Sequence, residues 1–330
     1  MSFQILQSQF QLWFAGDGGC VAYVDTGKAW VAAGPPLAPE ADLRAVASEF
    51  AQLAKTRERR VAFFGVENRL ADDPRLSSLL VGHQTVLDAK DWHATLREKS
   101  QLREQLRRAR NKGLCVEPLE WLKLADIHSS VRQEVELLIA RWQHSKAMPQ
   151  LGFVAQMQPL LLNGERRYYV ARHAGTCVGF AALDPVYRRG GWVLQHLVRA
   201  PDAPKGTAEA LIDAAIREAA ESSTGYFSLG LTPLGGDVGL WLNLAKRLFA
   251  PLYNFGGLER FRAKLSTEGG VPIYLAYPKA QSAPLAIYDS LVAFARGNLF
   301  GFGTEVLSLA REKLFQQAFV VVRMARGFHR

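Results

Sequence analysis

A short basic segment is the part of the chain whose residue types point most directly to chemistry. Between Arg97 and Lys112, seven cationic side chains stand against two acidic ones, a net of +5 in sixteen residues, while the whole chain carries +9. Four of these cations recur at helical spacing along one side: Lys99, Arg103, Arg107 and Arg110. Such a helix is suited to bind the phosphates of a polyanion. The common alternative for this charge pattern is a solvated helix face.

A second candidate lies where a predicted strand runs into a predicted helix. The junction reads Asp202-Ala-Pro-Lys205-Gly206-Thr207, and Thr207 is predicted as the N-cap of the helix. The first N–H groups of a helix lack partners within the helix, so this junction is suited to an anion. An ordinary Pro/Gly loop before a capped helix explains the same residues.

Composition limits the classes of function. The chain has 330 residues, of which 48% are hydrophobic and 22% charged, as in globular proteins. Three cysteines lie far apart without a CxxC pair, and the seven histidines lack metal-ligand spacing, so we expect no disulfide framework, metal or cofactor. A pI near 9.6 indicates an anionic partner. Neither a signal peptide nor eighteen consecutive apolar residues is visible, which predicts a cytoplasmic protein.

The elements that must position these residues form a repeated α/β pattern. In the first half, strands are predicted at 19–23, 29–33 and 61–66, with a helix over 40–55. A helix over 96–113, ending at Gly113, carries the basic residues. In the second half, strands are predicted at 114–117, 167–172, 176–183, 191–198 and 226–231, with helices at 125–142 and 207–222. The two halves share one order of elements, which predicts an architectural duplication.

Four blocks in register point to a family. They are the basic segment with LCVEPLE after it, HLVRAPDAPKGTAEALIDAAI, FSLGLTPLGG, and LYNFGGLERFRAKL followed by PIYLAYP. In this order they resemble the cytosolic C-terminal domain (DUF2156-type) of phosphatidylglycerol lysyltransferases and alanyl transferases, also called multiple peptide resistance factors. The resemblance covers about residues 10–278.

The resemblance implies an α/β (α+β) fold with two tandem acetyltransferase-like (GNAT) lobes separated by a basic helix. Expected boundaries are residues 1–95 for the first lobe, 96–113 for the helix, 114–280 for the catalytic lobe and 281–330 for an amphipathic helical tail. The implied activity is transfer of an aminoacyl group from charged tRNA to phosphatidylglycerol or a related acceptor. Because an aminoacyl ester is already activated, the site needs to position it, move a proton and stabilise an oxyanion.

The resemblance also assigns residues. Arg199 matches an arginine of the family's active-site motif, and Glu209 matches an acid of its loop–helix block. Lys264 matches the lysine of the closing motif, where its charge suits an oxyanion or a phosphate, with Arg262 close by. Asn254 belongs to the matched YNF block. The non-functional alternatives are that Glu209 only compensates the helix dipole in the first turn, and that Lys264 is a solvated surface side chain.

Two positions depart from the family pattern. His196 stands where the family usually has the aspartate of Asp-x-x-Arg, and histidine can act as a base near neutral pH. Residues 248–251 carry no acid, where relatives tend to have one. These departures keep two other readings open: a GNAT-type enzyme using an acyl-thioester donor, and an inactive module that binds RNA or membrane.

The tail adds a possible lipid contact. Residues 285–295 and 306–330 contain apolar residues at helical spacing, and the end of the chain is basic. This pattern is typical of a helix at the surface of an anionic membrane, and equally of a helix packed on the protein body.

Overall fold

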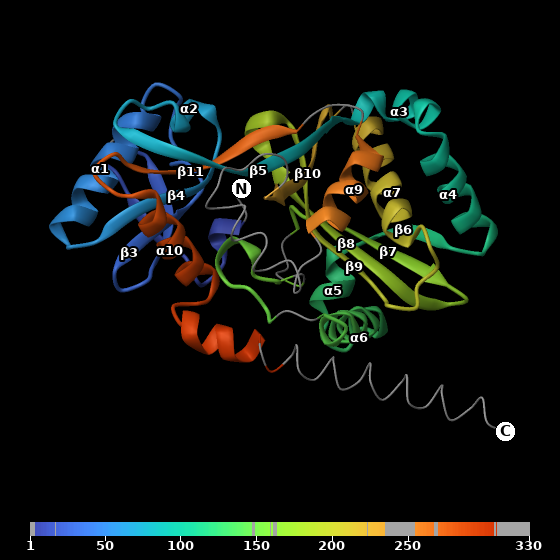
Figure 1. Ribbon diagram of the computed structural model, residues 1–330. Helices are drawn as coiled ribbons and strands as arrows, with labels where there is room; N and C mark the ends of the chain where they lie inside the picture. The colour runs from blue at the N-terminus through green and yellow to red at the C-terminus, as the bar shows by residue number, and fades with distance from the viewer. Residues whose placement is uncertain are drawn as a thin grey trace, which may run out of the picture.

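The computed structural model of the protein describes residues 4–16, 18–146, 149–158, 160, 164–222, 224–234, 255–266, 270–306 and 308. The first half contains η1 (Gln4–Leu6), β1 (Gln11–Phe14), β2 (Cys20–Asp25), β3 (Ala29–Ala33), α1 (Leu43–Thr56), β4 (Arg60–Val66), α2 (Asn68–Ala71), β5 (Leu76–Asp88) and η2 (Ala89–Asp91). Helices α3 (Trp92–Glu98) and α4 (Ser100–Asn111) follow. They lead into the second lobe (Figure 1).

The second half repeats the order of the first. It contains β6 (Cys115–Leu119), α5 (Trp121–Ala125), α6 (Ser130–His144), η3 (Phe153–Ala155), β7 (Arg167–His173), β8 (Thr176–Val186), η4 (Tyr187–Arg189), β9 (Gly191–Arg199), α7 (Thr207–Glu221), β10 (Tyr226–Pro233), α9 (Phe255–Leu265), β11 (Val271–Pro278) and α10 (Ala283–Phe294). In each half an antiparallel meander is followed by a helix and a parallel strand, β4 beside β3 and β10 beside β9. The predicted duplicated α/β fold is confirmed.

One sheet joins the two lobes by exchanging strands. Its order is β1-β2-β3-β4-β11-β5-β10-β9-β8-β7-β6. Strand β5 closes the first half of the chain but pairs with β10 of the second half, and β11 closes the second half but pairs with β4. The two exchanged strands also pair with each other. The lobes therefore share a continuous backbone hydrogen-bond network.

Helices pack on both faces of this sheet through periodic apolar side chains. Helix α1 buries Leu43, Val46, Ala47, Phe50 and Ala54, the period of an amphipathic helix. In the second lobe a single core joins α4, α6 and α7 to the sheet. Within the described part of the chain, no helix is long and apolar enough to cross a membrane.

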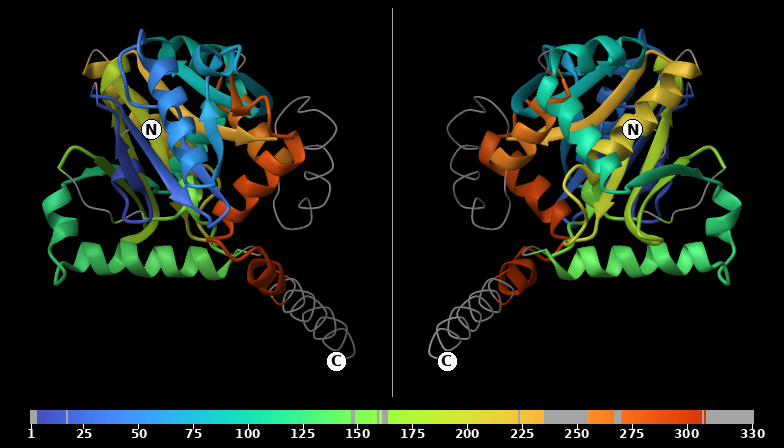
Figure 2. Two further views of the ribbon diagram at one scale, coloured as in Figure 1. Left: turned by 90° about the vertical axis from the view of Figure 1, so that its left-hand side faces the viewer. Right: turned by 90° about the vertical axis from the view of Figure 1, so that its right-hand side faces the viewer.

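The basic segment differs from its prediction in two ways. The backbone breaks at Lys99, so the expected helix over 96–113 is two helices, α3 and α4. Gly113 lies just past the end of α4 with φ +80, as a C-terminal glycine should. Helix α4 separates the lobes in the sequence, but in space it lies on the outer side of the second lobe, beside α7 (Figures 1 and 2).

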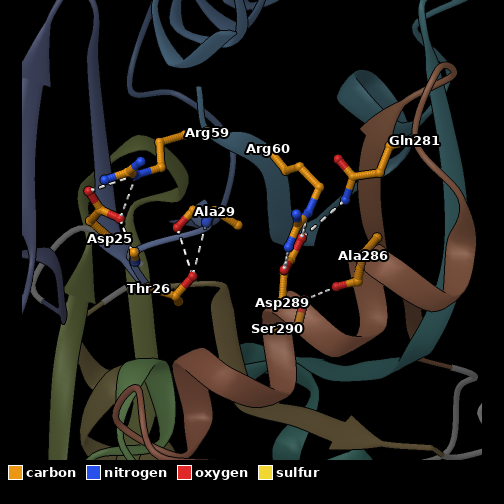
Figure 3. Close-up of polar contacts among 10 residues, drawn as sticks. Asp25, Thr26, Ala29, Arg59, Arg60, Gln281, Ala286, Asp289 and Ser290 are labelled. Carbon is orange, nitrogen blue, oxygen red and sulfur yellow. Dashed lines mark hydrogen bonds and ion pairs between the residues drawn. The ribbon is translucent and has the colours of Figure 1, made fainter. Parts of the chain in front are cut away.

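The tail begins as part of the first lobe. Helix α10 packs Ala286 and Ala293 into that lobe's core. Its Asp289 carboxylate accepts two hydrogen bonds from Arg60 of β4, at 2.8 and 2.6 Å (Figure 3). Residues 309–330, which include the basic end, lie outside the described residues.

Candidate functional site

Helix α4 is held against the second lobe by an apolar stripe and by two of its own cations. Leu102, Leu106 and Ala109 are buried. The Lys99 ammonium donates to the carbonyl of Ala263 on α9 at 3.3 Å. Arg103 donates to the carbonyls of Leu96 and Arg97 at the end of α3. Two of the four predicted anion-binding residues thus already hold α4 in place.

The other two predicted cations lie further along α4, and acids approach both. Arg107 binds Glu104 through two hydrogen bonds of 2.8 and 2.9 Å, and Arg108 binds the same carboxylate at 2.7 Å. These hydrogen bonds lower the pKa of Glu104 to about 2. Arg110 lies 3.6 Å from Asp213 of α7. The side chains of Arg107, Arg108 and Arg110 are 63%, 71% and 62% exposed, so their charge faces solvent.

The junction between β9 and α7 meets α4 directly. Gly206 is the N-cap residue of α7, with φ +102, and a Cβ there would lie 3.0 Å from Ala109 and 3.2 Å from the Gln105 carbonyl. The prediction of Thr207 as N-cap is wrong. Thr207 is the first helical residue, and its buried hydroxyl donates to the Pro204 carbonyl at 2.8 Å. Only glycine combines this backbone conformation with so close a helix contact.

Two other residues of the junction face outward. Lys205 is exposed, while Asp202 forms an ion pair of 2.9 Å with Arg141 of α6. Arg199 pairs with Gly179 across the sheet, so it lies on the face that carries α7. Its side chain is exposed at the end of β9. Arg199 and Lys205 are therefore cations open to a ligand at the start of α7.

Glu209 and Lys264 are in direct contact. The Lys264 ammonium of α9 donates to the Glu209 carboxylate of α7 at 2.8 Å. Gln105 of α4 joins both, because its amide nitrogen donates to Glu209 at 2.9 Å and its carbonyl accepts from Lys264. Glu209 is buried and the Lys264 side chain is 29% exposed. The cluster ties α4, α7 and α9 together just behind the junction.

His196 lies apart from this cluster. Gly179 of β8 faces α7, and His196 pairs with Ala182, three residues further along the same strand. Since side chains alternate along a strand, His196 points to the opposite face of the sheet. Its ring is buried, and among the described residues neither nitrogen has a hydrogen-bond partner at normal geometry, although the Gln158 backbone approaches it.

The surroundings of His196 argue against its assignment as a base. Burial and the positive charge of Arg166 lower the pKa of His196 to about 3, and the backbone of Gln158 offsets only part of this. A ring that stays neutral down to such a pH binds protons too weakly to serve as a general base near neutral pH. Arg166 itself forms a buried ion pair with Asp184 of β8 at 2.6 Å. Arg166 thus contacts Asp184, and its charge also acts on His196.

Arg262 binds β10 beyond the point where the pairing of β10 with β9 ends. Strands β9 and β10 run parallel but pair only at Trp192–Phe227 and Val193–Ser228. Beyond that point the guanidinium of Arg262 donates to the Gly230 carbonyl at 2.7 Å and to the Thr232 hydroxyl at 2.8 Å. Arg262 and Lys264 thus bind different elements, β10 and α7, although both lie on α9. Asn254 lies outside the described residues.

The arrangement also contains residues that the sequence analysis missed. Gln105 and Asp213 connect α4 to α7, and Arg166 and Asp184 surround His196. A usable signal existed for Asp184, because a charged residue directly follows the apolar run 177–183. For Gln105 the sequence offered no such signal, other than its position beside the apolar stripe of α4. Within the described ranges, no cluster of three or more His, Cys, Asp or Glu residues could hold a metal.

One curated protein is similar in sequence to most of this chain. An uncharacterized protein of Corynebacterium glutamicum is 26% identical over 292 residues, covering 82% of this chain and 36% of that protein. The chain thus spans about a third of that relative's length.

Solved structures share the fold. The C-terminal DUF2156 domain of a protein from Agrobacterium fabrum, assigned as a lysylphosphatidylglycerol synthetase, has a TM-score of 0.75 and 23% identity, covering 89% of this chain and 92% of that one. The L-PGS of Bacillus licheniformis has a TM-score of 0.71 and 21% identity, with 87% and 89% covered. FemX has a TM-score of 0.54 and 9% identity, with 85% and 90% covered.

The family model described as phosphatidylglycerol lysyltransferase, C-terminal, matches residues 1–277. The chain therefore belongs to the family of phosphatidylglycerol lysyltransferase C-terminal domains.

Proposed function

We propose that this protein transfers an aminoacyl group from charged tRNA to the hydroxyl of phosphatidylglycerol or a related anionic acceptor. The observation that carries the proposal is the family match over residues 1–277. The exposed cations of α4 and of the β9–α7 junction support it, because both substrates are anionic.

The proposed roles follow from the surroundings of each side chain. Arg199 and Lys205 bind phosphate at the start of α7, where both are exposed. Lys264 provides the positive charge that stabilises the oxyanion, and Glu209 orients it through their 2.8 Å contact. Because the His196 ring binds protons too weakly, Glu209 is the candidate base. Arg107 and Arg110 on α4 contact tRNA phosphates.

The observed position of Arg262 favours an aminoacyl ester over an acyl-thioester such as acyl-CoA. Diverging parallel strands leave backbone groups that an extended, amide-containing ligand can pair with. Here the Arg262 guanidinium already occupies the Gly230 carbonyl. The sequence from Arg199 to Gly206 also lacks the glycine spacing of a pyrophosphate loop.

Charged tRNA places the proposed reaction in the cytoplasm, and a lipid acceptor places it at the inner membrane surface. The exposed Leu285 and Tyr288 of α10 and the exposed Phe300 are candidate lipid contacts at the start of the tail.

The test is transfer of radiolabelled amino acid from a panel of charged tRNAs to phosphatidylglycerol vesicles and to membrane extracts. We expect label in the lipid fraction with at least one tRNA. A parallel thermal-shift comparison of acyl-CoAs with charged tRNA discriminates between the two donors. Stabilisation by acyl-CoA with no transfer from any tRNA would overturn the proposal.

A further inference from the structure

One carboxylate on α4 accepts hydrogen bonds from two exposed guanidinium groups. Glu104 accepts hydrogen bonds from Nε and Nη2 of Arg107 at 2.8 and 2.9 Å, and from Nε of Arg108 at 2.7 Å. The contact between Arg107 and Glu104 uses two parallel N–H donors, the geometry with which arginine also binds phosphate. Both arginines are more than 60% exposed, so their other donors face solvent.

The remaining cations of α4 do not share this arrangement. Lys99 and Arg103 donate to backbone carbonyls of α9 and α3, which fixes them to the protein. Arg110 lies 3.6 Å from Asp213, beyond hydrogen-bond distance. Arg107 and Arg108 are therefore the pair whose phosphate-binding groups are directed at an internal anion.

We propose that Glu104 is an internal competitor for nucleic-acid phosphate: it holds Arg107 and Arg108 in the unbound protein and is displaced when a phosphodiester binds them. This inference rests on the proposed use of tRNA. Exposed ion pairs within a helix are weak, so a polyanion that contacts several cations at once can displace the carboxylate. A single small anion gains too little to do so. Glu104 therefore restricts this surface to anions that present several negative groups at once.

The test compares Glu104→Gln with Glu98→Gln, using deacylated tRNA as the probe. Both variants remove one negative charge, but Glu98 is exposed at the end of α3, and no hydrogen bond or ion pair within the described residues engages its side chain. Glutamine is a good helix former, so both variants should fold, and circular dichroism checks this. We expect Glu104→Gln to tighten tRNA binding about fourfold, because each of the two released ion pairs contributes about twofold, and Glu98→Gln to tighten it less than twofold.

The salt dependence provides a second readout. In the native protein the displaced Glu104 carboxylate takes up about one cation from solution when tRNA binds, which offsets part of the counterion release. Glu104→Gln removes this uptake, so the slope of log affinity against log salt should steepen by about 1. In an Arg107→Gln/Arg108→Gln background, Glu104→Gln should act no more strongly than Glu98→Gln. Equal effects of the two glutamate variants in the native background would overturn the inference.

The outcome also separates this inference from the proposed function. If the unsubstituted protein binds tRNA but the two glutamate variants behave alike, only the internal competitor is lost. If the unsubstituted protein binds no tRNA and binds only phosphatidylglycerol vesicles, both the inference and the proposed donor are overturned.

Discussion

The ammonium nitrogen of Lys264 on α9 lies 2.8 Å from a carboxylate oxygen of Glu209 on α7, and Gln105 of the basic helix bonds both. Three helices that are far apart in the sequence therefore meet at one acid–base pair. The pair fixes the cationic surface of α4 relative to the start of α7, where Arg199 and Lys205 are exposed. Positioning of the proposed anionic substrate and stability of the lobe are therefore linked at this point.

This link predicts an energetic coupling between Lys264 and Glu209. Lys264→Met and Glu209→Gln should each lower the free energy of unfolding by about 2 kcal/mol. Each variant leaves the remaining, largely buried partner charged but without the opposite charge that compensates it. The double variant should lose at least about 1 kcal/mol less than the sum. Urea unfolding measures all three. The exposed pair Arg141–Asp202 is the control, with an expected coupling below about 0.5 kcal/mol. Additive losses at Lys264 and Glu209 would show that the contact does not act as a unit.

The close approach of α4 to α7 predicts a large effect of Gly206→Ala. The new Cβ would meet Ala109 at 3.0 Å in a backbone conformation of φ +102. We expect a loss of about 2–3 kcal/mol in unfolding free energy, from strain and overpacking together. Gly113→Ala is the matched control, since φ is +80 there but no atom lies within 4 Å, and about 1 kcal/mol is expected. Equal losses in the two variants would contradict the described helix contact.

His196 predicts a dependence of stability on pH. Its pKa is about 3 in the folded protein and near 6.5 in an unfolded chain. Between these values the unfolded state binds a proton that the folded state excludes, so stability falls as pH drops from about 6.5 to about 3. The loss from this group is a few kcal/mol and is absent above pH 7. The raised pKa of the buried Asp184 acts in the opposite direction.

A leucine variant isolates the contribution of this histidine. His196→Leu removes the titration and breaks no hydrogen bond of normal geometry, so the variant should fold and show a flatter pH profile below pH 6.5. Chemical denaturation at several pH values gives both curves. Superimposable profiles for His196→Leu and the native protein would contradict the neutral buried ring.

The contact between α10 and β4 predicts that the tail stabilises the first lobe. Asp289 is 1% exposed where it binds Arg60, so Asp289→Ala should cost about 3 kcal/mol. Asp25 binds Arg59 in the same lobe with both side chains near 30% exposed, and Asp25→Ala should cost about 1 kcal/mol or less (Figure 3). Urea unfolding followed by tryptophan fluorescence compares them. A small effect of Asp289→Ala would mean that α10 contributes little to the lobe.

Local patterns in the sequence predicted most of the second lobe. The hairpin between β7 and β8 is confirmed, as is α7, because turn residues and a helical period are local signals. Strand β5 was missed. Its sequence LSSLLVGHQTVLD lacks regular alternation, and its partners β10 and β11 lie far along the chain. Strands exchanged between the halves pair with partners distant in the sequence, so no local pattern predicts the pairing.

The site was predictable only in part, for a geometric reason. Motif matching placed Glu209 and Lys264 together, and the structure brings them into contact. It also grouped His196 with Arg199, three residues apart on one strand. That strand has an irregular register beside His196, and the two side chains lie on opposite faces of the sheet. Burial, which sets the pKa of His196, depends on residues that pack from elsewhere in the chain.

The most direct test of the central claim is transfer of a labelled aminoacyl group from charged tRNA into phosphatidylglycerol vesicles by the purified chain. The account predicts time-dependent label in the organic extract, lost with Lys264→Met and reduced at high salt, where binding to phosphates weakens. Deacylated tRNA added in excess should compete. Absence of label with every charged tRNA, from protein shown to be folded and to bind tRNA, would contradict the account.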